Sequence, residues 1–433
     1  MEGLYIYIIP HNPNVPFSIA RAPAVMSVLL LCLQKKNFGH LSVNCSIVES
    51  VLNVRRKGRL IMEKRQLKNG FESSLLGYGC MRLPVNEDGK IDEKKTEELL
   101  MKAYESGVTY FDTAYPYHDG ESERVVGKIL KKLDRSTFTL ATKLPCWFIN
   151  SLDDVKKYFD EQLSKLQTDY IDFYLLHALN GGSFKKMRDL GVIEELVKYK
   201  EKGLIKNLGF SFHDDYKAFE EIINYRDWDF CQIQLNYIDK DTQATMKGVE
   251  LSMKKNIPLV IMEPVKGGSL AKLPDEIFDI LKPFKRDLSA AGWALSWVAS
   301  CDNVKVILSG MTTMDQLTDN LKTFDNFKAL SDEEMAAVDK VATELEKRAK
   351  NGCTGCRYCM PCPMGVNIPR CFSIWNNYHK YDNVGEAKWA WNSMPEAERP
   401  DACKKCGVCE GKCPQKLNIR ADLEALNKEL KEL

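Results

Sequence analysis

The 433-residue sequence has almost no excess of charge of either sign. It contains 61 Lys and Arg against 60 Asp and Glu, which gives a formal net charge of +1. Chains that bind nucleic acid or a strongly acidic partner usually carry a clear excess of one sign. We therefore expect no nucleic-acid partner.

A hydrophobic run long enough to span a bilayer is also missing. The most apolar stretch, AVMSVLLLCL at 24–33, has ten residues, about half the length of a membrane helix. No small-residue cleavage site follows it closely, as a secretory signal would require. RRKGR at 55–59 and the regular pattern that begins at Met62 favour a start codon placed too far upstream. We interpret residues 1–61 as outside the working protein, with a targeting segment or a genuine extension as alternatives, and expect no membrane association.

A dinucleotide fingerprint of the G-x-G-x-x-G type is absent as well, because the glycine-rich LGYG at 76–79 lacks its spacing. Residues 70–325 instead alternate β-rich runs with amphipathic helical stretches such as 92–107 and 151–166. The β-rich runs lie at 74–80, 108–112, 137–143, 171–177, 205–211, 230–235, 258–264 and 304–310. Eight strands, each followed by a helix, predict an α/β fold, a parallel (β/α)8 TIM barrel. An open doubly wound sheet is the alternative.

Polar residues follow three successive strands of this predicted barrel. Asp112, Lys143 and His177 end the second, third and fourth strands, and Tyr117 follows Asp112 in the next loop. The C-terminal ends of barrel strands share one rim, where chemistry occurs in this fold. An ammonium group beside a tyrosine lowers the pKa of the phenol, and a carboxylate can hold that lysine in place. We expect Tyr117 to protonate a carbonyl oxygen, with His177 orienting the substrate, while a hydride donor reduces the carbonyl carbon.

Four segments of the body resemble the aldo/keto reductase family over roughly residues 65–325. They read FDTAYPYHDGESERVVGKIL (111–130), ATKLP (141–145), DFYLLH (172–177) and LGFS (208–211). The resemblance implies a (β/α)8 barrel that uses NADH or NADPH to reduce a small-molecule carbonyl substrate. It assigns the catalytic tetrad to Asp112, Tyr117, Lys143 and His177.

The same resemblance implies a nicotinamide cofactor site with several departures from the family pattern. The Ser-Asn pair that holds the carboxamide reads Ser211-Phe212, and Met262 replaces the tyrosine that stacks on the ring. A thioether can still pack against a ring. The family's Lys and Arg for a 2′-phosphate are replaced by Gly310 and Gln316, so a strict preference for NADPH is not expected. The full set of implied cofactor-binding residues is Gly79, Met81, Asp112, Ser211, Gln232, Met262, Gly310, Gln316 and Asn320.

Cysteine is abundant and unevenly placed. Of 15 cysteines, nine lie in the last 81 positions, behind a charged, capped helical stretch at 331–350. An odd total with such clustering is a poor disulfide framework, and three cysteines in strict x2 succession are unusual for zinc. The second run, C-x2-C-x2-C-x3-C-P, is the ferredoxin pattern for a [4Fe–4S] cluster, and the first run, C-x2-C-x2-C-x2-C-P, is one residue shorter. Iron–sulfur clusters are therefore favoured over zinc or disulfides.

Two [4Fe–4S] clusters are expected, with the last cysteine of each run binding the other cluster. This assigns Cys353, Cys356, Cys359 and Cys413 to one cluster, and Cys403, Cys406, Cys409 and Cys362 to the other. Because the first run is short, the fourth ligand of each cluster stays open and Cys371 is a spare candidate. The aromatic linker between the runs predicts a mostly helical ferredoxin-like domain.

The predicted organisation is therefore residues 1–61 as an extension, 62–330 as the barrel, and 331–433 as a helical linker with the iron–sulfur domain. Thiolate-bound clusters favour a reducing compartment, so we expect a cytoplasmic enzyme, with a ferredoxin or another redox protein as partner. Two functions are compatible with the sequence. The first is a carbonyl reductase coupled to cluster electron transfer, and the second is an electron-transfer protein whose barrel is a weak catalyst or a scaffold.

Overall fold

The structure is a computed structural model that describes residues 60–433. The apolar run at 24–33, the basic stretch at 55–59 and residues 1–59 of the predicted extension lie outside the described residues. Among the described residues, no helix is both long enough and apolar enough to cross a bilayer.

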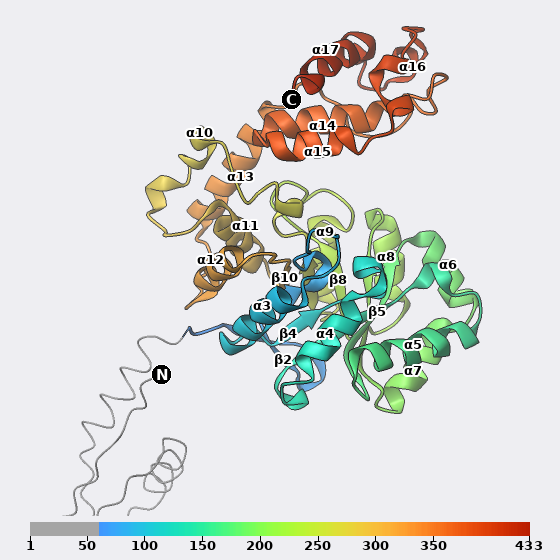
Figure 1. The fold of residues 1–433 in the computed structure, drawn as a ribbon, viewed down its shortest axis with the longest axis vertical. Helices are drawn as coiled ribbons and strands as arrows, with labels where there is room; N and C mark the ends of the chain where they lie inside the picture. Colours follow the sequence, from blue (N-terminus) through green and yellow to red (C-terminus); the bar gives the residue numbers. More distant parts are fainter. Residues whose placement is uncertain (1–59) are drawn as a thin grey trace, which may run out of the picture. The chain divides into compact units, whose positions relative to one another are not determined.

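Eight parallel strands close into a barrel (Figure 1), which confirms the predicted fold. The last strand pairs with both the first strand and its own predecessor, so the alternative of an open sheet is wrong. The barrel strands are β3 (Leu76–Gly79), β4 (Tyr110–Asp112), β5 (Thr139–Leu144), β6 (Ile171–Leu179), β7 (Ile205–Phe212), β8 (Phe230–Gln234), β9 (Leu259–Met262) and β10 (Val304–Ser309).

Helices follow the strands and surround the barrel. Two of them have side-chain caps at their N-termini: Asp92 caps α3, and Ser151 forms a capping box with Asp154 at the start of α5. Two helices rather than one follow β6. The helices of this part are α3 (Glu93–Glu105), α4 (Ser122–Leu130), α5 (Leu152–Leu166), α6 (Gly181–Asp189), α7 (Val192–Glu201), α8 (Tyr216–Tyr225), α9 (Thr245–Lys254), α10 (Asp275–Phe278), α11 (Ala290–Ala299) and α12 (Met314–Phe324).

The inside of the barrel is a packed core, closed at its N-terminal end. Alternate strand residues face the axis, among them Tyr110, Phe173, Phe230 and Val260, all buried. An antiparallel hairpin of β1 (Lys64–Gln66) and β2 (Glu72–Ser74) precedes the barrel. Phe71 of this hairpin packs edge-on against Phe173, with ring centroids 5.7 Å apart. The hairpin does not cover the opposite rim of the barrel, at the C-terminal ends of the strands, where the predicted active site lies.

The C-terminal region is helical and has a hydrophobic core of its own, as predicted. A capping box of Ser331 and Glu334 begins its first helix. The core is formed by residues such as Phe372, Trp391 and Leu426, and the cluster cysteines pack at its edge. The helices are α13 (Asp332–Lys347), α14 (Ile368–Tyr381), α15 (Val384–Asn392), α16 (Val408–Lys412) and α17 (Ile419–Lys431).

Candidate active site and iron–sulfur ligands

The strands carry three of the four predicted catalytic residues to the same rim. Asp112 lies two positions after the inward-facing Tyr110 on β4, and Lys143 lies two positions after Ala141 on β5. His177 follows Leu175 on β6 in the same way. Because side chains alternate along a strand, all three face the barrel axis at its C-terminal end.

Lys143 is the centre of this group. Its Nζ donates hydrogen bonds to Asp112 Oδ1 at 2.6 Å and to the Thr113 carbonyl oxygen at 2.8 Å, and it lies 3.2 Å from the Tyr117 hydroxyl. The side chain is fully buried, and burial alone acts to lower its pKa. The neighbouring Asp112 and Tyr117 outweigh burial and raise the pKa of Lys143, so its ammonium stays charged.

Tyr117 combines two opposing influences. Burial raises the pKa of its phenol, and the Lys143 ammonium acts in the opposite direction. The expected influence of lysine is therefore present, but burial is larger and the pKa ends above its ordinary value. The phenol is consequently protonated at neutral pH, which a proton donor requires.

His177 completes the group opposite Tyr117. The Tyr117 and His177 rings are nearly perpendicular, with centroids 6.1 Å apart. The centroid of the Trp147 ring lies 5.1 Å from that of His177. Burial, with the Lys143 charge as a second cause, holds the pKa of His177 well below its usual range. The imidazole is therefore neutral and can donate one hydrogen bond.

A buried polar network fixes the backbone around Lys143. Glu123, from the GESE segment, accepts hydrogen bonds from Thr142 at 2.5 Å and from Gln162 at 2.6 Å. Gln162 also donates to the Lys143 carbonyl oxygen at 3.0 Å. This network links α4 and α5 to β5 directly behind the lysine, so Glu123 supports the site.

The predicted carboxamide-binding residues lie side by side on the neighbouring strands. Ser211 and Gln232 are register partners on β7 and β8. The Ser211 hydroxyl accepts a hydrogen bond from the Ala178 N–H at 2.7 Å, which leaves its own proton to donate. Gln232 Nε2 donates to the Met262 sulfur at 3.6 Å, while its buried Oε1 has no partner among residues 60–433. An unpaired buried carbonyl beside a free hydroxyl fits a carboxamide.

Phe212 does not take part in this arrangement. It is fully buried and packs against Phe219, with ring centroids 5.2 Å apart. The side chain that replaces the family's asparagine therefore belongs to the layer between β7 and its helix.

The remaining predicted cofactor-binding residues differ in whether their side chains are exposed or already hydrogen-bonded within the protein. Gly79 ends β3 beside Ser309 and Gly310 of the last strand and its loop. Met81 is 61% exposed. Gln316 caps α12 by accepting the Thr312 N–H at 2.7 Å, and Asn320 donates to the Ser309 hydroxyl at 2.7 Å. Both amides thus already have a structural role.

Sequence reasoning missed two residues at the same rim. Gln234 lies two positions after Gln232 on β8, is buried, and has no partner for either amide atom within residues 60–433. Arg82 donates to the Gly267 carbonyl oxygen at 2.6 Å and so connects the loops after β3 and β9. The two-residue period along β8 was a usable signal for Gln234, whereas no motif marks Arg82.

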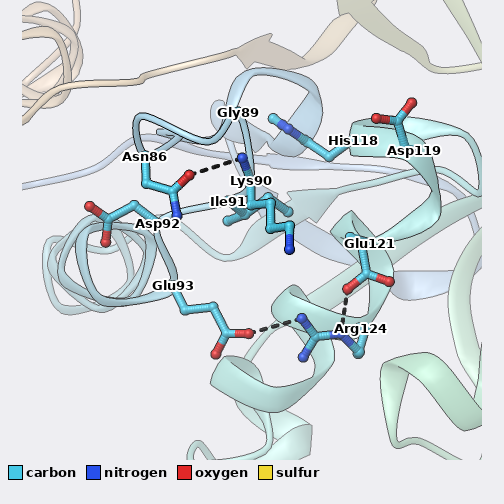
Figure 2. A pocket seen from close by; sticks show the side chains of 10 residues that line it. All are labelled: Asn86, Gly89, Lys90, Ile91, Asp92, Glu93, His118, Asp119, Glu121 and Arg124. Atoms are coloured by element: carbon cyan, nitrogen blue, oxygen red, sulfur yellow. Dashed lines mark hydrogen bonds and ion pairs between the residues drawn. The ribbon is translucent and has the colours of Figure 1, made fainter.

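A polar hollow lies outside this group, between the loop that leads into α3 and the start of α4 (Figure 2). Its charges are largely paired, because Arg124 bonds to both Glu93 and Glu121. His118 Nε2 accepts the Leu83 N–H at 3.0 Å. None of the tetrad residues lines it, and we assign it no chemistry.

The cluster cysteines surround two adjacent cavities in the C-terminal region. Both cavities are otherwise lined mainly by apolar side chains and share Ile368. The first contains Cys353, Cys356, Cys359 and Cys413, and the second contains Cys403, Cys406, Cys409 and Cys362. Each cavity thus holds three cysteines of one run and the last cysteine of the other. Four thiolates per cavity are the donor set that a [4Fe–4S] cluster requires.

Cys371 lies apart from both cavities. It is fully buried beside the Glu398 carbonyl oxygen, and burial raises the pKa of its thiol to about 12. Every cysteine in residues 60–433 is a free thiol. Within the same residues no three His, Cys, Asp or Glu side chains are placed to hold a single metal ion.

Two family models match this chain. The aldo/keto reductase family model covers residues 75–343, and a 4Fe-4S dicluster domain model covers residues 352–417.

Individual relatives match mainly over the barrel. The uncharacterized oxidoreductase YqkF of Bacillus subtilis is 26% identical over 312 residues, 64% of this chain and 95% of that protein. Methylglyoxal reductase YeaE of Escherichia coli is 27% identical over 289 residues, 64% of this chain and 95% of that protein. Among solved structures, the holo form of aldo-keto reductase AKR11C1 from Bacillus halodurans is 26% identical, with a TM-score of 0.56. The match covers 65% of this chain and 96% of that one.

Proposed function

Because this chain belongs to the aldo/keto reductase family and carries a C-terminal 4Fe-4S domain, we propose that it is a nicotinamide-dependent carbonyl reductase. The observation that carries the proposal is the buried Asp112–Lys143 pair beside the protonated Tyr117 phenol. The similarity to a methylglyoxal reductase supports a small aldehyde or ketone as substrate. Clusters bound by the cysteines of this chain would favour a reducing compartment, and we propose the cytoplasm.

The residues at the ends of β7 and β8 are suited to hold the cofactor. Ser211 would donate to the oxygen of the nicotinamide carboxamide, and Gln232 Oε1 would accept from its amide nitrogen. Met262 would pack near the ring. When bound, the reduced nicotinamide supplies a hydride to the carbonyl carbon. No Lys or Arg occupies the predicted 2′-phosphate positions Gly310 and Gln316, which favours NADH or the use of both cofactors.

The tetrad residues would orient the substrate, donate the proton and stabilise the resulting phenolate. His177, as a neutral imidazole, would donate a hydrogen bond to the substrate oxygen and orient it. Tyr117 would transfer its phenolic proton to that oxygen as negative charge develops on it. The phenolate that remains is stabilised by the Lys143 ammonium 3.2 Å away, which Asp112 holds in place. Tyr117 then recovers a proton from water.

We further propose that the two cysteine groups hold two [4Fe–4S] clusters that exchange electrons in support of this activity. A cluster supplies one electron at a time when bound, whereas a hydride carries two. Two electrons and one proton from water would regenerate the reduced nicotinamide from its oxidised form, so the coupling needs two successive one-electron transfers from the clusters to the nicotinamide.

The proposal is tested on anaerobically purified protein with NADH or NADPH and a panel of small aldehydes and ketones. We expect carbonyl-dependent cofactor oxidation, and Tyr117→Phe should lower kcat by about 10²–10⁴-fold because the proton donor is lost. Cofactor affinity should be unchanged. If the iron-loaded protein oxidises neither cofactor with any carbonyl, the scaffold alternative is preferred.

Coupling is tested separately with a ligand variant, Cys406→Ala. If coupling exists, this variant should lose cluster-dependent electron transfer and also change carbonyl turnover in the presence of an electron donor. Coupling is contradicted if Tyr117→Phe abolishes only carbonyl reduction and Cys406→Ala abolishes only electron transfer by the clusters. That result would not contradict the proposed carbonyl reductase activity.

A further inference from the structure

The segments that carry the cluster cysteines, 353–364 and 403–416, are here called the cluster face. They contain one acidic residue, Glu410, and five basic residues. The basic residues are Arg357, Lys404, Lys405, Lys412 and Lys416. The whole chain has 61 basic against 60 acidic residues, so this positive excess is local to the cluster face.

Most of this charge is not neutralised by neighbouring side chains. Lys405 pairs with Glu424, and Glu410 is paired with Arg420 at 2.8 Å. The other four basic residues of the cluster face form no ion pair within residues 60–433, and all four are exposed. The single negative charge is therefore masked, while the positive charges point to solvent.

The clusters' own ligands reach the same surface. Cys356 and Cys406, the second cysteine of each run, are both exposed. Tyr358 and Val408 lie just before the third cysteine of each run and are 66% and 42% exposed. Exposed apolar groups beside exposed ligands, with lysines around them, match the layout of transient protein interfaces.

The walls of the two cavities have the same sign of charge. Arg357 lines the first cavity, and Lys404 and Arg420 line the second. No acidic residue of the described chain is among the residues that line either one. The walls of both cavities therefore present no carboxylate to a negatively charged partner.

Resting on the proposed two-cluster domain, we propose that the cluster face docks a small acidic iron–sulfur electron-carrier protein. Complementary charge would steer and orient the carrier, and Tyr358 and Val408 would form the apolar centre of the contact. The carrier class follows from the chemistry, because an iron–sulfur carrier exchanges single electrons as a cubane does. In each encounter one electron leaves the reduced carrier and reduces one cluster of this chain, with no proton or bond involved. Two encounters reduce both clusters by one electron each.

The test is stopped-flow mixing of the iron-loaded, full-length protein with a plant-type [2Fe–2S] ferredoxin of net negative charge, in whichever direction electrons flow spontaneously. The second-order rate should fall by about tenfold or more as salt rises from about 0.01 M to about 1 M, because the Debye length shrinks from about 30 Å to about 3 Å. A basic one-electron carrier should react more slowly at low salt. A rate that is indifferent to salt, or that rises with it, would overturn the proposal.

A charge-reversal pair locates the surface. Lys412→Glu with Lys416→Glu should lower the low-salt rate by about tenfold or more and flatten its salt dependence. The matched control, Lys102→Glu with Lys131→Glu, changes the same charge at exposed barrel positions without ion pairs in residues 60–433 and should leave the rate within about twofold. Equal rates for the two variants would overturn the docking surface.

Iron and sulfide content and reduction by dithionite are measured on every variant. Normal clusters with no response to ferredoxin would overturn the docking surface alone. A full-length protein without iron would overturn both the proposed clusters and the docking surface.

Discussion

At the scale of residues, the proposed chemistry depends on one proton equilibrium, that of the Tyr117 phenol. In the proposed reaction Tyr117 must hold its proton until the substrate oxygen accepts it, and must then tolerate a negative charge. Burial raises the pKa of the phenol and secures the first condition. The Lys143 ammonium at 3.2 Å provides for the second. Burial and the Lys143 ammonium have opposite effects on the pKa of the phenol. In the proposed reaction, burial keeps the phenol protonated before proton transfer, and the ammonium stabilises the phenolate after it.

The pH profile of carbonyl reduction should reflect this balance. Since Tyr117 acts as an acid and its pKa lies above the ordinary value of about 10, kcat should stay flat from about pH 6 to about pH 9 and fall only in alkali. Lys143→Met removes the influence that lowers the pKa of Tyr117. It should therefore move the alkaline fall to higher pH and reduce kcat by about 10²-fold. A fall in kcat near neutral pH in the native enzyme would contradict this account.

The sequence predicts the identity of these residues better than their electrostatics. The sequence indicates Asp112, Lys143 and His177 because they lie at the ends of successive predicted strands. The face to which a strand side chain points depends only on its position in the strand, so the local sequence pattern is sufficient. The rise in the pKa of Tyr117 was missed because burial comes from segments far away in the chain. Gln234 was overlooked although it shares the two-residue period of β8, and its lack of a hydrogen-bond partner within residues 60–433 is visible only after the barrel closes.

At the scale of elements, strand bounds were predicted to within about two residues because β-branched runs end at turn residues. Contacts between helices were not predicted. Gly127 on α4 is the clearest example, since a Cβ there would lie 2.4 Å from the Lys165 carbonyl oxygen and 2.6 Å from the Leu166 Cα of α5. The two helices therefore touch through backbone atoms, which no periodicity in the sequence reveals.

Gly127→Ala should lower the free energy of unfolding by about 1–3 kcal/mol, because the added methyl group forces α4 and α5 apart. The thermal unfolding midpoint measures the effect. The control is Gly385→Ala on α15, where the nearest neighbouring atom would be 3.7 Å away and alanine favours the helix. Equal midpoints for the two variants would show that α4 and α5 are not in close contact.

At the scale of the whole molecule, the proposed function joins hydride chemistry in a barrel to single-electron chemistry in a helical domain. The cysteine runs predicted the second part because their spacing is specific to clusters. The short spacing of the first run left the fourth ligands open. The two cavities favour the proposed grouping, because Cys362 lines the cavity of the second run and Cys413 lines that of the first. Cys371 lies away from both cavities because of the way α14 packs, and this packing cannot be predicted from the spacing of the cysteines.

The proposed ligand assignment predicts a specific loss of iron. Cys362→Ser should reduce the iron content from about eight to about four atoms per chain, because only the second cluster loses a ligand. Cys371→Ser should leave the iron content unchanged. Carbonyl reduction with NADH or NADPH serves as a check on barrel folding in both variants. Iron loss in Cys371→Ser, or full iron in Cys362→Ser, would contradict the assignment.

The most direct measurement of the central claim follows the hydride itself. The enzyme is incubated with a responsive carbonyl and with NADH or NADPH that carries deuterium at the transferable position of the nicotinamide, and the alcohol is examined by mass spectrometry. Direct hydride transfer should place one deuterium at the former carbonyl carbon of each product molecule, and Tyr117→Phe should lose product formation. An alcohol that contains no deuterium would show that the electrons arrive by another route, and would contradict direct hydride transfer in the barrel.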